Sequence, residues 1–247
     1  MEITKTVLSY ERVTGSFDRL PVIIVAAGNS SRMQGVNKQF ADIKGTPVLA
    51  RTISKFQNCD LIKSIIVVAK NDDLVSVRQL CDKYEFTKVT DIVPGGNDRT
   101  ESVKCGLDRL PKGEKCVLIH DGARPFLTEK MIKDVAGALR TADCAVVAKK
   151  SVDTVKETDS EGTVVKTIDR KKVYLAQTPQ GVNVSKYKFA LNSFNKQTFT
   201  DDASLMEAMG YKCVICEGSV FNIKITTPED LLFADVIAGI EEGNKCG

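Results

Sequence analysis

Short apolar runs alternate with longer amphipathic segments along most of this chain, from residue 22 onwards. Runs rich in β-branched residues predict strands, and segments whose apolar residues recur every three or four positions predict helices. Their alternation predicts a mostly parallel central sheet with helices on both faces, an α/β, Rossmann-like architecture. The expected strands are 22–25, 62–69, 88–93, 116–120, 144–147 and 211–216, and the expected helices are 48–57, 73–84, 100–110, 129–141 and a last one beginning at 228.

Residues 149–172 break this alternation. Two segments that favour strands, 152–157 and 163–168, flank the turn-rich sequence Asp159-Ser-Glu-Gly162, in which glycine suits a positive φ. The segment therefore predicts a β-hairpin arm that protrudes from the main sheet. An isolated hairpin is at best marginally stable in water, so its apolar residues need a covering surface. These residues are Val155, Val164, Val165 and Ile168.

The stretch from Val22 to Lys38 carries the clearest chemical signal. Its apolar run ends in Ala26-Ala27-Gly28, which small polar residues, Arg32 and Lys38 follow. Small side chains let backbone N–H groups approach a bound anion, and two cations in one loop suit a polyphosphate. The loop has neither the Gly-x-Gly-x-x-Gly of dinucleotide sites nor the Gly-Lys-Ser/Thr ending of P-loops. It indicates a phosphate-binding loop of another kind.

Ala26-Ala27-Gly28-x-x-x-Arg32-Met33, followed by Lys38-Gln39, resembles the opening motif of sugar-phosphate nucleotidyltransferases. It resembles in particular the IspD family, the 2-C-methyl-D-erythritol 4-phosphate cytidylyltransferases. Four further blocks match that family in the same order, so the resemblance covers residues 22 to about 238. The blocks are Gly95-Gly-Asn-Asp-Arg-Thr-Glu-Ser102, His120-Asp-Gly-Ala-Arg-Pro125, Thr167-Ile-Asp-Arg170 with Gln177-Thr-Pro-Gln180, and Asn222-Ile-Lys-Ile-Thr-Thr-Pro-Glu-Asp230.

The resemblance implies transfer of a cytidylyl group from CTP to 2-C-methyl-D-erythritol 4-phosphate, which gives 4-diphosphocytidyl-2-C-methyl-D-erythritol and pyrophosphate for isoprenoid precursor synthesis. It also implies Mg²⁺, bound mainly through the CTP phosphates, and no side chain is singled out as a direct metal ligand. A phosphate monoester with a second pKa of about 6 is largely a dianion at neutral pH, so it needs no general base. Cations that offset the charge of the phosphates are the main requirement.

The resemblance implies roles for particular residues. Arg32 and Lys38 belong to the triphosphate and stabilise the transition state, whereas Arg170 and Lys224 bind the substrate phosphate. Nucleotide-binding positions are Ala26, Ala27, Gly28, Asn29, Ser30, Ser31, Gly95, Gly96, Asn97, Ser102, Asp121 and Gly122. Substrate-binding positions are Arg124, Thr154, Arg170, Thr178, Thr200, Asp201 and Lys224.

Several of these residues also have an ordinary structural interpretation. Most surface lysines and arginines are solvated loop charges. Asp121 suits either a contact to phosphate-bound Mg²⁺ or its water, or a turn cap, and His120 suits a packed strand end, because the reaction needs no base. Lys38 follows Val36-Asn37, where the family usually has proline, and this departure predicts a looser loop.

Lys224 lies where an expected strand over 222–225 meets the last helix. Strand alternation would place it opposite Ile223 and Ile225, with Thr227 as the helix N-cap and Pro228 as the first helical residue. In the resembling family the arm clasps a second subunit, which implies a homodimer. An arm that crosses to its partner would carry Arg170 into the neighbouring site.

Composition and charge exclude few classes but set the background. A net charge of +3 is too small to indicate a nucleic-acid partner or a membrane surface, and no apolar run reaches membrane-spanning length. No secretory signal is visible, so we expect a cytoplasmic protein with reduced cysteines. In a strand, Cys213 and Cys216 would point to opposite faces and could not share a metal. We expect one nucleotidyltransferase domain over 22–240, preceded by an extension of unknown role over 1–21.

Two alternative functions stay open from the residues alone. A cytidylyltransferase acting on ribitol 5-phosphate or another polyol phosphate differs from the methylerythritol enzyme by a methyl group and chain length. A pocket discriminates differences of that size by only about 1–3 kcal/mol. A non-catalytic nucleotide-binding regulator is the second alternative, although binding alone would not require both groups of cations.

Overall fold

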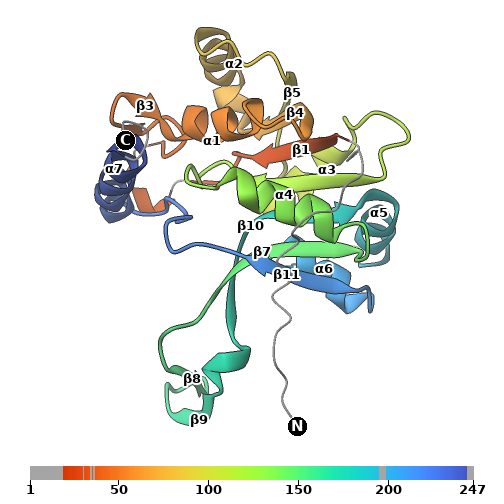
Figure 1. Ribbon diagram of the computed structural model, residues 1–247, viewed down its shortest axis with the longest axis vertical. Helices are drawn as coiled ribbons and strands as arrows, with labels where there is room; N and C mark the ends of the chain where they lie inside the picture. The colour runs from red at the N-terminus through yellow and green to blue at the C-terminus, as the bar shows by residue number, and fades with distance from the viewer. Residues whose placement is uncertain (1–18, 30, 34, 36, 195–198, 244–247) are drawn as a thin grey trace.

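The computed structural model describes residues 19–243, apart from residues 30, 34, 36 and 195–198 (Figure 1). Most of the expected N-terminal extension, residues 1–18, lies outside the described residues. The body of the molecule is built on a seven-stranded sheet with the order β11-β7-β10-β6-β1-β4-β5. Its strands are β1 (Leu20–Val25), β4 (Ile62–Ala69), β5 (Val89–Pro94), β6 (Cys116–Asp121), β7 (Cys144–Lys150), β10 (Tyr174–Asn183) and β11 (Cys213–Glu217).

The sheet is mostly parallel, as the alternation of strands and helices predicts. The exception is β10, which runs antiparallel to both β6 and β7. This strand was not predicted, because its buried centre is polar rather than apolar: Gln177, Thr178 and Gln180 are all buried. A strand of this composition is stabilised by its neighbours in the tertiary structure, and the sequence pattern alone does not reveal it.

Helices cover both faces of the sheet, and the β-branched strands bury side chains on each side. In β1, Val22 and Ile24 pack on one face, while Ile23 packs on the other. The first face is covered by α1 (Val48–Gln57), α2 (Leu74–Lys83) and α4 (Glu129–Ala138), and the second by α3 (Arg99–Leu107), α5 (Val184–Ser193) and α6 (Asp202–Ala208). The sequence pattern did not identify α5 and α6.

The two cysteines of β11 confirm the expected strand alternation. Cys216 packs in the core on one face of the sheet, and Cys213 packs against the core on the other. All cysteines among the described residues are free thiols. None of the helices in the described part of the chain is long and apolar enough to cross a membrane.

A third small core joins the last helix, α7 (Pro228–Gly243), to the hairpin formed by β2 (Asp42–Ile43) and β3 (Thr46–Pro47). The segment before α7 belongs to no strand in the described part of the chain, so the expected strand over 222–225 is wrong. Alternation nevertheless holds locally, since Ile225 is fully buried while Lys224 is partly exposed. The carboxylate of Asp230 accepts the Thr226 and Thr227 N–H groups and thereby fixes the start of the helix.

The predicted arm is present and projects from the body of the molecule (Figure 1). Its strands, β8 (Val155–Thr158) and β9 (Val164–Ile168), pair with each other in an antiparallel hairpin and with no other strand among the described residues. At the turn, the Asp159 carboxylate accepts two backbone N–H groups, and Gly162 has a φ of +86°. Val164 is 55% exposed and Val165 is 60% exposed, so the arm displays apolar surface.

Candidate functional site

A cleft of about 530 Å³ opens at the carboxyl ends of β1, β4, β5 and β6. The chain order reverses on either side of β1, because β4 and β6 lie on its opposite sides, and such a switch point is where open α/β sheets bind ligands. The lining residues include Ala27, Gly28, Asn29, Lys38, Lys70, Gly95, Gly96, Asn97, Arg99, Ser102, Asp121 and Lys224. Most of these residues belong to the motif blocks identified in the sequence.

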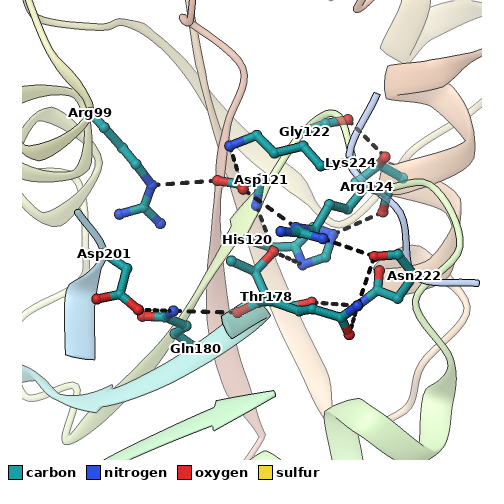
Figure 2. A network of polar contacts seen from close by, with 12 residues as sticks. Arg99, His120, Asp121, Gly122, Arg124, Thr178, Gln180, Asp201, Asn222 and Lys224 are labelled. Carbon is teal, nitrogen blue, oxygen red and sulfur yellow. Dashed lines mark hydrogen bonds and ion pairs between the residues drawn. The ribbon is translucent and has the colours of Figure 1, made fainter. Parts of the chain in front are cut away.

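Asp121, the last residue of β6, is the centre of a charged cluster at the cleft floor (Figure 2). Its Oδ2 lies 2.8 Å from Lys224 Nζ and 3.5 Å from Arg124 Nε, and its Oδ1 lies 3.4 Å from Arg99 Nε. Burial opposes ionisation of this carboxyl, but the three cations outweigh burial and hold its pKa well below the usual range. Asp121 is therefore an ionised anchor for three cations, a role that neither of the two interpretations from sequence described.

Lys38 lies buried beside this cluster. Burial lowers the pKa of Lys38, and the nearby positive charges of Lys224 and Arg32 lower it further, whereas Asp121 opposes the shift. Several cations close enough to repel one another in a concave site indicate a binding place for a highly charged anion. Arg32 itself is exposed in the short helix η1 (Ser31–Met33), outside the residues that line the cleft.

Asn37, the residue before Lys38, makes hydrogen bonds on two sides. The Asn37 Nδ2 donates to Asp73 Oδ2 over 2.9 Å, and the Asn37 Oδ1 accepts the Gln39 N–H. The Asn37 carbonyl also accepts the Phe40 N–H over 3.0 Å. Asparagine thus supplies hydrogen bonds at the position before Lys38, and the looser loop expected from the absence of proline stays a prediction.

The loop after β5 is closed by its own hydrogen bonds. The Ser102 hydroxyl donates to the Asp98 carbonyl over 2.7 Å and accepts the Gly96 N–H over 3.2 Å. A Cβ added to Gly95 would overlap the side chain of Ala27, so this loop meets the loop after β1 closely. Ser102 thus shapes the loop, and the Asn97 amide donates to Glu101. Contacts of either residue to a nucleotide stay a prediction.

His120 is buried at the end of β6, which confirms its interpretation as a packed residue. Its Nε2 lies 3.0 Å from the Arg124 carbonyl, which can only accept, so Nε2 carries the proton. The Thr178 hydroxyl, 2.9 Å from Nδ1, therefore donates to the ring and accepts the Asp121 N–H. Burial lowers the pKa of His120 to about 4, so the neutral ring links β6 to β10.

A buried ion pair behind the cleft was missed by the sequence analysis. Arg99 Nη2 donates to Asp202 Oδ2 over 2.7 Å, and the Tyr187 hydroxyl donates to Asp202 Oδ1 over 2.6 Å. Asp202 is 1% exposed, so both donors are needed to keep its charge buried. Arg99 thereby connects α6 to Asp121. Its position inside the block from Gly95 to Ser102 was the available signal, since arginine there follows the N-cap residue of α3.

The sequence analysis also missed Asn222, which fixes the segment that carries Lys224. Its Nδ2 donates to the Thr178 carbonyl over 2.9 Å, and its own carbonyl accepts Arg124 Nη1 over 2.8 Å. These bonds tie the segment before α7 to β10 and to the loop after β6 (Figure 2). Gly122 contributes in the same region, because its carbonyl accepts the Thr52 hydroxyl.

Not every predicted position reaches the cleft. Thr154 and Arg170 lie on the arm, where Arg170 Nη1 donates to the Val152 carbonyl over 2.7 Å. Thr200 is exposed, and Asp201 caps α6 while accepting the Gln180 amide (Figure 2). Ser30 lies outside the described residues, and the side chain of Ser31 is likewise not described.

We predict that stability falls between pH 6.5 and pH 4.5 because of His120, the one histidine in the sequence. Its pKa of about 4 in the folded protein lies below the value of about 6.5 in the unfolded chain, so the unfolded chain binds more protons in this window. The free energy of unfolding should drop by up to about 2 kcal/mol as the pH falls. Urea unfolding at several pH values measures it.

The His120→Gln variant is the control, since it removes the imidazole and keeps a polar side chain. Its stability should be lower at pH 7 but nearly flat across the same window. An equal slope in the variant and in the original protein would contradict the assignment.

Comparison with known proteins supports the motif assignments. The family model described as IspD, 2-C-methyl-D-erythritol 4-phosphate cytidylyltransferase, matches residues 20–239. The chain is 42% identical to the 2-C-methyl-D-erythritol 4-phosphate cytidylyltransferase of Halalkalibacterium halodurans, over 90% of this chain and 97% of that protein. It is 41% identical to the protein of the same name from Syntrophus aciditrophicus, over 91% of this chain and 98% of that protein.

Solved structures agree with the sequence relatives. The crystal structure of 4-diphosphocytidyl-2C-methyl-D-erythritol synthase from Anaerococcus prevotii superposes with a TM-score of 0.80 at 32% identity. The superposition covers 89% of this chain and 96% of that one. The similarity therefore extends over most of both chains.

Proposed function

The chain belongs to the IspD family of 2-C-methyl-D-erythritol 4-phosphate cytidylyltransferases, and from this premise we infer the reaction that takes place in the cleft. The protein transfers a cytidylyl group from CTP to 2-C-methyl-D-erythritol 4-phosphate and releases pyrophosphate. The observation that carries this conclusion is the group of cations at the cleft floor, where Lys38 lies beside Lys224, Arg124 and Arg99 around one carboxylate. Such a charge excess suits a reaction between two polyanions.

The chemistry needs fixed positive charge more than a proton acceptor. The phosphate of the acceptor is largely a dianion at neutral pH, and one of its oxygens attacks the α-phosphorus of CTP. A bond from that oxygen to the α-phosphorus forms, the bond from the α-phosphorus to the bridging oxygen breaks, and the electron pair leaves with pyrophosphate. Side chains that bind the phosphates reduce their repulsion and stabilise charge on the leaving group. The buried, neutral His120 has no proton to accept.

We assign Arg32 and Lys38 to the triphosphate and Lys224 and Arg170 to the phosphate of the acceptor. The electrostatic coupling of Lys38 with Lys224 supports this, because two cations close enough to interact suit phosphates that lie next to each other. Asp121 holds Lys224 from below without blocking its access to the cleft, since the lysine side chain stays 37% exposed. We also assign Arg124 and Thr178 to the acceptor.

The nucleotide lies across the loops after β1 and β5 in this proposal. Backbone groups of Gly95 and Gly96 would contact the cytosine, and Asn97 would reach the ribose hydroxyls. The phosphates would lie against the backbone of Ala26–Ser31, with Asp121 and Gly122 at the floor. The lining of the cleft supports this arrangement, because Gly28, Gly95 and Gly96 all border it.

The family activity is consistent with a divalent metal, and we propose Mg²⁺ carried by the nucleotide. The described carboxylates that line the cleft are Asp98 and Asp121. The first caps α3 and the second is paired with cations, so the donor set fits a metal held mainly by phosphate oxygens. No group of three or more potential metal ligands occurs among the described residues, which is consistent with this arrangement. When bound, the metal offsets phosphate charge.

We propose that the enzyme is a homodimer in which each arm serves the neighbouring site. Val164 and Val165 are exposed on the arm and need a cover, and Arg170 and Thr154 lie on the arm instead of in the cleft of their own chain. A twofold exchange of arms would satisfy both observations. Thr200 and Asp201 would border the same acceptor pocket.

Two further proposals concern organisation. We propose one nucleotidyltransferase domain over 22–240, with 1–21 as an extension outside it, and the family match over residues 20–239 supports this division. We propose a cytoplasmic location, which the free thiols among the described cysteines support.

The substrate assignment predicts a clear preference in a turnover assay. Purified protein should release pyrophosphate from CTP with 2-C-methyl-D-erythritol 4-phosphate, and kcat/KM for ribitol 5-phosphate should be about 10- to 200-fold lower. The small structural difference between the two acceptors sets this range. Equal or reversed values would favour the polyol-phosphate alternative, and binding of CTP without turnover on any acceptor would favour the regulator.

Removing either triphosphate cation should depress turnover without unfolding the protein. We expect Arg32→Ala and Lys38→Ala each to lower kcat by about 10²- to 10³-fold, the usual loss for one transition-state contact. Lys188→Ala is the matched control, because this exposed lysine of α5 lies outside the cleft. Variants that keep the original melting temperature and the original kcat would contradict the assignment.

The dimer proposal is tested by mass and by subunit mixing. Light scattering should give two chains for the intact protein, and a variant with residues 155–165 replaced by a short Gly-Ser turn should be a monomer that binds CTP but hardly turns over. Full activity of that variant, or a one-chain mass for the intact protein, would overturn the proposal.

Mixing decides whether Arg170 acts across the interface. Equal amounts of Arg170→Ala and Lys38→Ala chains, unfolded and refolded together, should recover about a quarter of the original activity, because half of the dimers are mixed and each mixed dimer has one intact site of two. No recovery would mean that Arg170 acts in its own chain.

A further inference from the structure

Lys70 contributes a cation to the cleft that no motif identified. It directly follows β4, and its half-buried side chain lines the cleft together with Gly28, Asn29 and Lys38. Because β4 is the neighbour of β1, the carboxyl end of β4 lies beside the loop that follows β1. The position of Lys70 therefore results from sheet topology.

The charge of Lys70 has no counterion within the described protein. Its ammonium group makes no hydrogen bond or ion pair with any described residue. The nearest turn carries Asp73, but that carboxylate accepts Asn37, and Asp121 is paired with the cations of the cleft floor. An unpaired cation on the wall of a concave site attracts an anionic ligand.

The same turn links Lys70 to the residue before Lys38. The Lys70 carbonyl accepts the Asp73 N–H over 3.0 Å at the start of η2 (Asn71–Asp73), and the Asp73 carboxylate holds Asn37, the residue before Lys38. The two lysines also interact, since the charge of Lys70 adds to burial and to Lys224 and Arg32 in lowering the pKa of Lys38. They are thus placed to bind one ligand together.

The topology indicates which part of the ligand Lys70 contacts. Lys224 and Asp121 lie on the β6 side of the loop after β1, where the acceptor phosphate is proposed to bind, and Lys70 lies on the opposite, β4 side. Resting on the proposed function, we propose that Lys70 binds the β- and γ-phosphates of CTP and the pyrophosphate that they become. Lys70 neither gives nor takes a proton in the reaction, and it acts by charge alone.

Lys70→Met tests this, because it keeps the length of the side chain and removes the charge. A charge-assisted hydrogen bond contributes about 1.5–3 kcal/mol, so KM for CTP and the inhibition constant of pyrophosphate should each rise about tenfold or more. The KM for the acceptor should stay unchanged, and kcat should change much less than in Lys38→Ala. Lys70→Arg should restore most of the loss, and Lys188→Met, on the exposed side of α5, is the matched control.

Calorimetry separates this proposal from the proposed function. In Lys70→Met the affinity for CTP and for pyrophosphate should fall, while the affinity for CMP, which lacks the β- and γ-phosphates, should not. Unchanged CTP and pyrophosphate binding in the folded variant, or an equal loss for CMP, would overturn the role of Lys70. Absence of turnover in the original protein would overturn the proposed function, and the comparison of CTP with CMP would still decide the role of Lys70.

Discussion

The site depends on the ion pairs that the buried carboxylate of Asp121 makes with three cations. Lys224, Arg124 and Arg99 come from three different segments of the chain, and their mutual repulsion would drive them apart without an anion between them. Even with Asp202 paired to Arg99, two carboxylates cannot neutralise three cations, so the cluster keeps an excess of positive charge. The excess is directed at the cleft, where phosphates can balance it. The folded protein therefore presents at the cleft the positive charge that the reaction needs.

The scaffold around this carboxylate consists mainly of neutral hydrogen bonds. His120 accepts from Thr178, Thr178 accepts from the Asp121 backbone, and Asn222 binds β10 on one side and Arg124 on the other. Since each partner is buried, loss of any one would leave a polar group unsatisfied. The polar centre of β10 is explained in this way: the strand positions the charged groups rather than filling the core.

A second anchor lies behind the cleft. Asp202 is buried between Arg99 and the Tyr187 hydroxyl, and it joins α5 and α6 to the charged cluster. Arg99 therefore has one carboxylate on each side, which restricts its guanidinium to one orientation. On the opposite wall, the turn after β4 binds Asn37, the residue before Lys38, through Asp73. The cleft is thus fixed from both flanks while its floor stays electropositive.

Local sequence determined the elements that its own periodicity encodes. The β-branched runs specified the parallel strands, the turn at Asp159–Gly162 specified the arm, and the motif blocks located Lys38, Asp121 and Lys224, because small loop residues and cations at strand ends have a direct chemical meaning. Strand β10, the partners of Asp121 and the unpaired charge of Lys70 were decided only by the tertiary structure. A polar strand becomes buried only when two neighbours cover it. A carboxylate acquires its cations, and a lysine its place in a cleft, only when segments up to about a hundred residues apart are brought together by the order of the strands.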